Sequence, residues 1–121
     1  MDEILNLFNI LSDKTRLRIL LLLMKSELCV CEIFETLDMS QPRVSQQLSI
    51  LKQSKLIKDR RVGKWIYYKI DENMYTKPLK EILPLIPDWL KNNDEFMNDQ
   101  AMMDKILQRN KQCGCKIYGG E

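Results

Sequence analysis

The segment Ser40-Gln41-Pro42-Arg43-Val44-Ser45-Gln46-Gln47-Leu48, SQPRVSQQL, decides how the middle of this 121-residue chain folds. Ser40 can cap a helix by accepting a hydrogen bond from the amide of Arg43. Pro42 lies in the first turn, where its missing N–H breaks no hydrogen bond. Val44, Leu48 and Leu51 recur at helical spacing. The segment therefore predicts an amphipathic helix with a buried stripe and polar side chains elsewhere.

The residues before this helix predict a second, shorter helix that leads into it. Apolar residues at helical spacing indicate a helix over about 31–37, and Asp38-Met39 then makes a tight turn. Two further helices are expected upstream, one ending near residue 12 and one over about 13–25 that Ser12 or Asp13 can cap. Two short helices joined by a tight turn form a helix-turn-helix.

The residues after this helix predict a β-hairpin. Two β-prone runs, 56–61 and 65–70, are joined by Val62-Gly63-Lys64. Pro84 and Pro87 must split the helical stretch over about 77–92, and a last helix is expected over about 94–110. The expected fold is mainly α with a small β-hairpin, a winged helix-turn-helix. We expect one domain over residues 1–110 and a flexible, cysteine-containing tail over 111–121.

Basic charge is concentrated in this central part of the chain. Residues 40–69 carry eight Lys or Arg and one acid, a net charge of +7, whereas the rest of the chain has a net charge of −5. Such a block indicates a nucleic-acid surface, although a solvated basic face gives the same pattern.

A winged helix-turn-helix places its second helix in the major groove of double-stranded DNA. The polar residues expected to meet base edges or phosphates are Ser40, Gln41, Arg43, Ser45, Gln46 and Gln47 on the helix, and Arg60, Arg61 and Lys64 near the hairpin tip. The alternatives are solvated helix residues and a charged sheet edge that discourages aggregation. For Trp65, Tyr67 and Tyr68, packing is favoured over base stacking.

The segment Glu27 to Ile33, ELCVCEI, places two thiols one residue apart directly before a predicted helix. An α-helix turns about 100° per residue, so Cys29 and Cys31 would point about 200° apart and could not both face one ion from a regular helix. Cys29 must therefore precede the helix, or the first turn must open. We expect joint use of both thiols to conflict with this helix and so to affect the DNA-reading helix. The alternative is a pair of small buried hydrophobes.

A second pair of thiols, Cys113 and Cys115, lies in the expected tail. All four can serve as soft sulfur donors in a reducing compartment, and the absence of His excludes mixed Cys/His zinc sites. Together they could form a Cys₄ site for Zn(II), Cd(II) or Pb(II). The tail pair could also be a bystander, and the thiols could serve redox sensing instead.

Other features exclude broad classes of protein. The acidic start lacks the pattern of a secretory signal, and the longest apolar run has six residues, whereas a bilayer span needs roughly 20. We therefore expect a cytoplasmic protein without a membrane partner. Without CxxC, His or a Gly-rich phosphate loop, the sequence does not indicate an enzyme.

The segments ELCVCEI, SQPRVSQQLSILKQSKLI and RRVGKWIYYKI, in this order, resemble the ArsR/SmtB family of metal-responsive transcriptional repressors, and within it the arsenite-responsive branch. The resemblance implies a dimeric repressor that releases operator DNA when a metal or metalloid binds. Exposed apolar faces on the first and last helices are consistent with a homodimer formed through them, which would read a palindromic operator.

The resemblance also bears on the ligands. It implies that As(III) acts as inducer by binding cysteine thiolates, here Cys29 and Cys31 with one tail cysteine. In the resembled branch a third cysteine often follows the pair by three residues, where this chain has Phe34, so the tail pair is the natural substitute. Relatives that sense cadmium or lead carry similar segments, which leaves Cd(II) and Pb(II) as alternatives.

Overall fold

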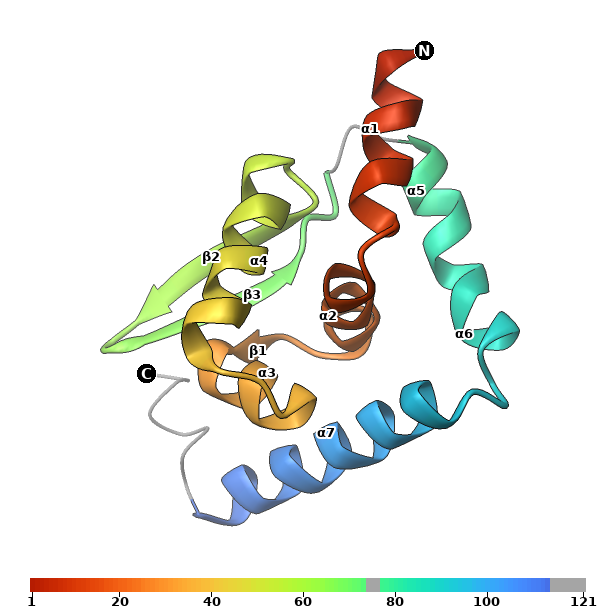
Figure 1. Ribbon diagram of the computed structural model, residues 1–121. Helices are drawn as coiled ribbons and strands as arrows, with labels where there is room; N and C mark the ends of the chain where they lie inside the picture. Colours follow the sequence, from red (N-terminus) through yellow and green to blue (C-terminus); the bar gives the residue numbers. More distant parts are fainter. Residues whose placement is uncertain (74–76, 114–121) are drawn as a thin grey trace.

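The computed structural model describes residues 1–73 and 77–113, with side chains described at 1–73 and 78–110. Seven helices, one 3₁₀ turn and three strands occupy these residues (Figure 1). In chain order they are α1 (Asp2–Leu11), α2 (Lys14–Lys25), β1 (Leu28–Cys29), α3 (Val30–Leu37), α4 (Gln41–Gln53), β2 (Ile57–Val62), β3 (Trp65–Ile70), α5 (Lys77–Ile82), η1 (Leu83–Leu85), α6 (Ile86–Trp89) and α7 (Asp94–Cys113).

Helices α3 and α4 form the predicted helix-turn-helix. Asp38 ends α3 in the left-handed conformation, with φ 55°, which turns the chain within two residues. Ser40 then caps α4 by accepting a hydrogen bond from the Arg43 amide, 3.4 Å from its Oγ, as predicted. Asp13 caps α2 in the same manner, 3.0 Å from the Arg16 amide. These ends form where the sequence predicts them because caps depend on residues only three apart.

The sheet has three antiparallel strands in the order β1-β3-β2, one more than the expected hairpin. The hairpin turns at Gly63, whose φ of 63° is a conformation that glycine adopts without steric cost. The additional strand, β1, consists of Leu28 and Cys29, which pair with Tyr68 and Tyr67 of β3. A two-residue strand carries no periodicity, so sequence patterns do not reveal it.

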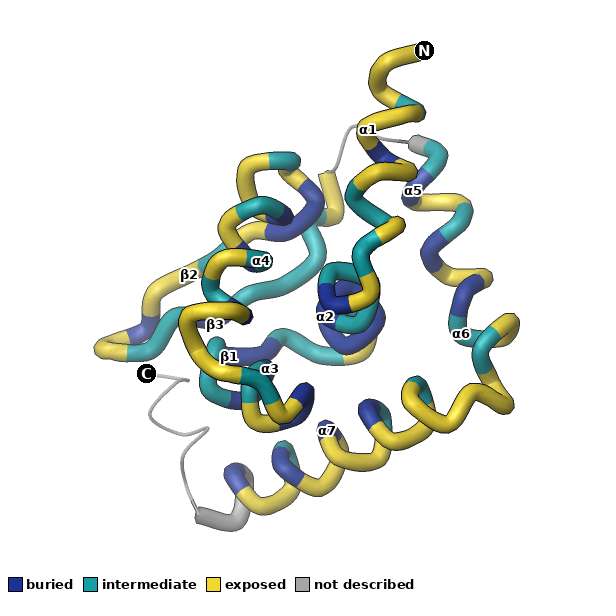
Figure 2. The backbone as a smooth tube through the Cα atoms, viewed as in Figure 1, coloured by how far each residue is buried: buried dark blue, intermediate teal, exposed yellow. Residues whose placement is uncertain are grey.

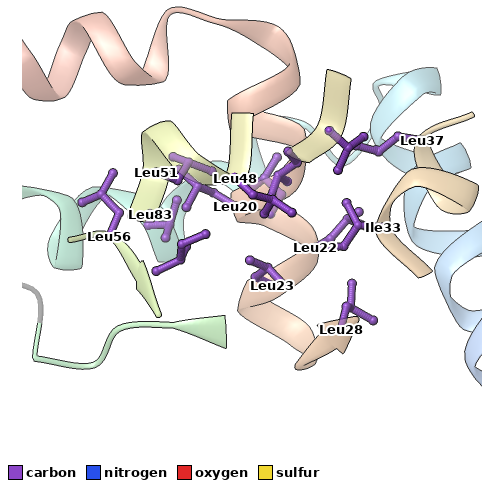
Figure 3. Close-up of a cluster of buried hydrophobic side chains, with 14 of the residues drawn as sticks. Leu20, Leu22, Leu23, Leu28, Ile33, Leu37, Leu48, Leu51, Leu56 and Leu83 are labelled. Carbon is purple, nitrogen blue, oxygen red and sulfur yellow. The ribbon is translucent and has the colours of Figure 1, made fainter. Parts of the chain in front are cut away.

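The hydrophobic core is centred on α2, and Figure 3 shows its leucines meeting side chains from four other elements. Leu20 and Leu22 are fully buried. The neighbours labelled in the close-up are Leu28 of β1, Ile33 and Leu37 of α3, Leu48 and Leu51 of α4, Leu56, and Leu83 of η1. The stripe predicted from the sequence of α4 is therefore the surface by which it packs on α2.

Helix α7 crosses one end of the molecule, and Figure 2 shows one face of it buried and the other exposed. It packs on α2, where the guanidinium of Arg18 donates to both Asp99 oxygens at 2.8 and 2.9 Å, and on α3. It continues to Cys113, three residues beyond the predicted end. The prolines divide the stretch before it into α5, η1 and α6, as predicted. None of the described helices combines the length and apolar character that spanning a membrane requires.

Candidate DNA-binding and thiol sites

The N-terminal half of α4 presents polar side chains to solvent. Ser40, Gln41, Arg43 and Gln46 are exposed, and Ser45 is half-buried. Ser49 follows Gln46 by three residues and is exposed on the same face, although it was not among the predicted contacts. These side chains lie outside the buried stripe of α4, so the surface that they form is available to a partner.

Gln47 behaves differently from the other predicted contacts on α4. Its side chain is half-buried, and its Oε1 accepts a hydrogen bond from Arg16 Nη1 at 3.1 Å. The same guanidinium donates to the carbonyl oxygens of Ile10 and Asn9, at 3.0 and 3.2 Å. Because Gln47 lies three residues after Val44 and next to Leu48, it is turned toward α2 and the end of α1.

The three basic residues of the hairpin that were predicted to contact DNA lie in different places on the sheet. Arg61 shares a face with Asp59, and Asp59 accepts from Lys52 of α4 at 2.9 Å, so Arg61 lies on the side of the reading helix. Lys64 is exposed at the turn. Arg60 lies on the opposite face, where its Nε and Nη2 donate to both carboxylate oxygens of Glu27, at 2.7 and 2.9 Å. No sequence pattern predicts this ion pair, because its two residues are 33 positions apart.

The two thiols of the ELCVCEI segment come from different local conformations. Cys29 is the last residue of β1 and the N-cap of α3, with extended φ and ψ of −81° and 163°. Cys31 lies in the first turn of the helix. Cys29 therefore precedes the helix, one of the two expected arrangements, and α3 is intact with both side chains at one cavity. That joint use of the two sulfurs as ligands conflicts with this helix stays a prediction.

The cavity between the two thiols and α7 has a volume of about 170 Å³. The residues that line it are Cys29, Cys31, Glu32, Glu35, Trp65, Tyr67, Arg109 and Asn110. Trp65, Tyr67 and Tyr68 are packing residues, as predicted: the first two pack around Cys29 and Val62, and Tyr68 packs against the main core. The buried indole N–H of Trp65 has no acceptor among the described residues, which leaves it a donor beside the cavity.

Two acidic residues of α3 join the thiol cavity to α7. Glu32 is buried, and its Oε1 accepts from the backbone N–H of Cys29 at 3.0 Å while its Oε2 accepts from Asn110 Nδ2 at 2.9 Å. Arg109 donates to both Glu35 oxygens, at 2.6 and 2.9 Å. Sequence reasoning missed all four residues. A Glu three positions after an N-cap is a recognisable capping pattern, so Glu32 had a local signal, whereas Asn110 had none.

The environment of Cys29 keeps its thiol protonated. Burial raises the pKa of this thiol to about 12, against the opposing effect of a hydrogen bond from the Glu32 backbone. The nearby Glu32 carboxylate and the Cys31 thiol raise it further. The cavity therefore presents a neutral sulfur at Cys29.

The structure describes only the backbone of one of the two tail cysteines. Cys113 is the last residue of α7, and its side chain is not described; Cys115 lies outside the described residues. Within the part of the chain that is described, no three Cys, Asp or Glu side chains are grouped to hold one metal ion. Cys29 and Cys31 thus need a further donor from elsewhere to complete a three-sulfur site.

Comparison with known proteins decides the family. Residues 13–59, which span α2 through α4 and enter β2, match the model of the bacterial regulatory protein arsR family. Arsenic resistance transcriptional regulator ArsR1 of Pseudomonas putida is 37% identical over 116 residues, which cover 93% of this chain and 74% of that protein. This chain belongs to the ArsR family.

Two further comparisons agree with ArsR-family membership. The arsenical resistance operon repressor of Escherichia coli is 46% identical over 71 residues, which cover 58% of this chain and 61% of the length of that repressor. Among solved structures, the homodimeric winged helix-turn-helix DNA-binding domain Mb0332 of Mycobacterium bovis matches with a TM-score of 0.61 and 26% identity, covering 77% of this chain and 82% of that domain.

As an ArsR-family protein, the chain is a DNA-binding transcriptional repressor with the predicted winged helix-turn-helix fold. Helix α4 corresponds to the reading helix of that fold, and β2 and β3 correspond to its wing.

Proposed function

We propose that this ArsR-family repressor binds a palindromic operator as a homodimer and releases it when As(III) binds Cys29, Cys31 and a cysteine of the tail. One observation carries the proposal: thiols from β1 and α3 reach a single cavity whose opposite wall is α7. Soft thiolate donors without His favour a thiophilic ion.

The chemistry of As(III) suits this cavity. Trivalent arsenic exchanges hydroxides for thiolates, and the proton of each thiol leaves with a hydroxide as water. Such an exchange places no net charge in the cavity, which matters because Cys29 is buried beside the Glu32 carboxylate. The names of the arsenic-responsive relatives from E. coli and P. putida support the same inducer.

The position of α7 supports a tail cysteine as the further donor. Asn110 bonds Glu32 at the cavity wall, and Cys113 follows Asn110 by three residues on the same helix. Either Cys113 or Cys115 would then supply a third sulfur that the described side chains lack.

The homodimer is supported by apolar side chains that this chain leaves uncovered. Leu5 and Phe8 of α1 and Met97 and Met102 of α7 are all exposed, Leu5 by 58%. Pairing two copies through these helices would cover them, and the similar winged helix-turn-helix domain from Mycobacterium bovis is homodimeric. A two-fold dimer presents two α4 helices to half-sites about one DNA turn apart.

The experiment is titration of a fluorescent operator duplex, selected from random sequence, with the wild-type protein while anisotropy is recorded. A coupling free energy of about 3 kcal/mol would make arsenite weaken binding roughly 150-fold. Cys29→Ser and Cys31→Ser proteins are expected to bind the duplex with wild-type affinity, and arsenite should leave that affinity unchanged. Thiolate absorbance of the wild type and of a chain truncated before Cys113 counts the sulfur ligands.

Parallel titrations distinguish the alternatives. Release by Cd(II) or Pb(II) without release by arsenite would assign a cadmium or lead sensor, and release by peroxide alone would assign a thiol-redox sensor. Divalent cations displace thiol protons into solution, whereas the exchange with arsenous acid forms water, so proton release measured beside anisotropy separates them. If no metal, metalloid or oxidant changes the affinity, the sensing role is refuted.

A further inference from the structure

Two side chains of the wing, those of Trp65 and Tyr67, line the thiol cavity, and Tyr67 also contacts Arg60. In the sheet, Tyr67 of β3 lies opposite Cys29 of β1 on one side and opposite Arg60 of β2 on the other. Directly paired residues of antiparallel strands place their side chains on the same face. Cys29, Tyr67 and Arg60 therefore form a single row across all three strands, on the face away from α4.

Contacts run along the whole row. Tyr67 is only 4% exposed and packs with Cys29 in the cavity wall. The Arg60 guanidinium lies over the Tyr67 ring, 5.6 Å from its centroid. Glu27, at the start of the β1 segment, holds that guanidinium through two hydrogen bonds. Arg60, at one end of the row, is therefore bonded to Glu27, two residues before Cys29 at the other end.

This arrangement makes Arg60 unlike the other basic residues of the hairpin. Arg61 and Lys64 form no ion pair with another described residue and lie on the reading-helix side or at the turn. A phosphate would have to displace the two-point pairing with Glu27 to bind Arg60. The pairing and the ring contact instead fix where β2 lies relative to β1.

We propose that Tyr67 and Arg60 are positioning residues that couple the thiol site to the wing, rather than contacts to DNA. The inference rests on the proposed function, because it concerns how occupancy of that cavity reaches the operator. Binding one ion through both Cys29 and Cys31 draws their sulfurs toward it, and Tyr67 packs against Cys29 and also contacts Arg60. Occupancy shifts Tyr67, the Arg60–Glu27 contact follows, and the wing changes position.

The test compares Arg60→Gln with Lys64→Gln as the matched loss of one hairpin charge. For each protein, operator affinity is measured with and without arsenite and as a function of salt. Arg60→Gln is expected to reduce the arsenite-induced change in affinity by about fivefold or more, with an unchanged salt slope. Lys64→Gln is expected to lower the salt slope by about 1 and to leave the arsenite response intact.

Two substitutions of Tyr67 separate the ring from the hydroxyl. Tyr67→Phe keeps the ring under Arg60 and should preserve the response, whereas Tyr67→Val should lose it while arsenite still binds, as judged by thiolate absorbance. Arg60→Gln with a normal arsenite response and a reduced salt slope would overturn the proposal and make Arg60 a phosphate contact.

A second readout does not depend on arsenite. A cysteine thiolate attacks the sulfenyl sulfur of methyl methanethiosulfonate, which forms a methyl disulfide on the protein and releases methanesulfinate. Amide chemical shifts of β2 then report whether the wing responds. Shifts in wild type that disappear in Arg60→Gln support the coupling even if arsenite proves inactive, in which case only the proposed inducer fails. Equal shifts in both proteins would overturn the coupling.

Discussion

Glu32 and Asn110 are joined inside the protein by a hydrogen bond of 2.9 Å between Oε2 and Nδ2, although 78 residues separate them in the sequence. Both residues are buried, 3% and 8% exposed. The other oxygen of Glu32 accepts from the Cys29 amide, so one carboxylate connects the segment that carries the thiol with α7. A carboxylate so placed needs its partners, because an unpaired buried acceptor is costly.

Removing the amide of Asn110 should therefore weaken the attachment of α7. We expect Asn110→Ala to lower the free energy of unfolding by about 1–3 kcal/mol, since it removes a hydrogen bond to a buried carboxylate. Urea denaturation measures the change. Gln108→Ala, an exposed position on the same helix, is the control and should stay within about 0.5 kcal/mol of wild type. A loss no larger than that of the control would contradict the role of this hydrogen bond.

The two cavity thiols should differ in reactivity in the metal-free protein. Cys29 is buried with a pKa raised to about 12, whereas Cys31 is half-buried. Because the thiolate is the reactive form, iodoacetamide should modify Cys31 faster than Cys29 at neutral pH. Mass spectrometry of a Cys113→Ser, Cys115→Ser background follows both sites. Equal rates would show that Cys29 is not shielded, and urea should abolish any difference.

The Arg109–Glu35 ion pair predicts a pH dependence of stability. Its hydrogen bonds lower the pKa of Glu35 in the folded protein. The stabilisation is therefore present above the unfolded pKa and is lost as the pH falls through the lower folded value. Urea midpoints of wild type and Glu35→Gln should differ by a constant amount at neutral pH and converge as the pH falls below the usual range of a glutamate pKa. Both side chains are about half exposed, so salt should shrink the difference.

Substitutions of the two neighbouring glutamines of α4, Gln46 and Gln47, should affect different properties: base discrimination and stability, respectively. Gln46 is exposed, and Gln46→Ala is expected to reduce discrimination among operator sequences by about 1–3 kcal/mol if its amide pairs with a base. Gln47 bonds Arg16, so Gln47→Ala should lower stability and weaken all duplexes alike. Binding to a panel of single-base operator variants, with denaturation of each protein, distinguishes the two. A Gln47→Ala protein with altered base preference and normal stability would reverse the assignment.

Helix ends and buried stripes of this protein follow from the sequence. Ser40, Asp13 and the spacing of Val44, Leu48 and Leu51 act within one or two turns, so their effects can be recognised without knowledge of the fold. The geometric conflict between Cys29 and a regular helix is local in the same sense, and the structure resolves it by placing Cys29 before α3. The family, too, could be inferred from three short segments.

What surrounds the thiols was decided by tertiary structure. Strand β1 exists because Leu28 and Cys29 find partners about 40 residues later on β3, and two residues carry no pattern of their own. Three side-chain contacts join residues that are 31 to 78 positions apart in the sequence. They are the ion pair of Arg60 with Glu27 and the hydrogen bonds of Arg16 with Gln47 and of Asn110 with Glu32. Hydrophobic periodicity and capping rules report on neighbours within a few residues. Contacts between distant elements depend on how α2, the sheet and α7 pack, and only the folded chain specifies that.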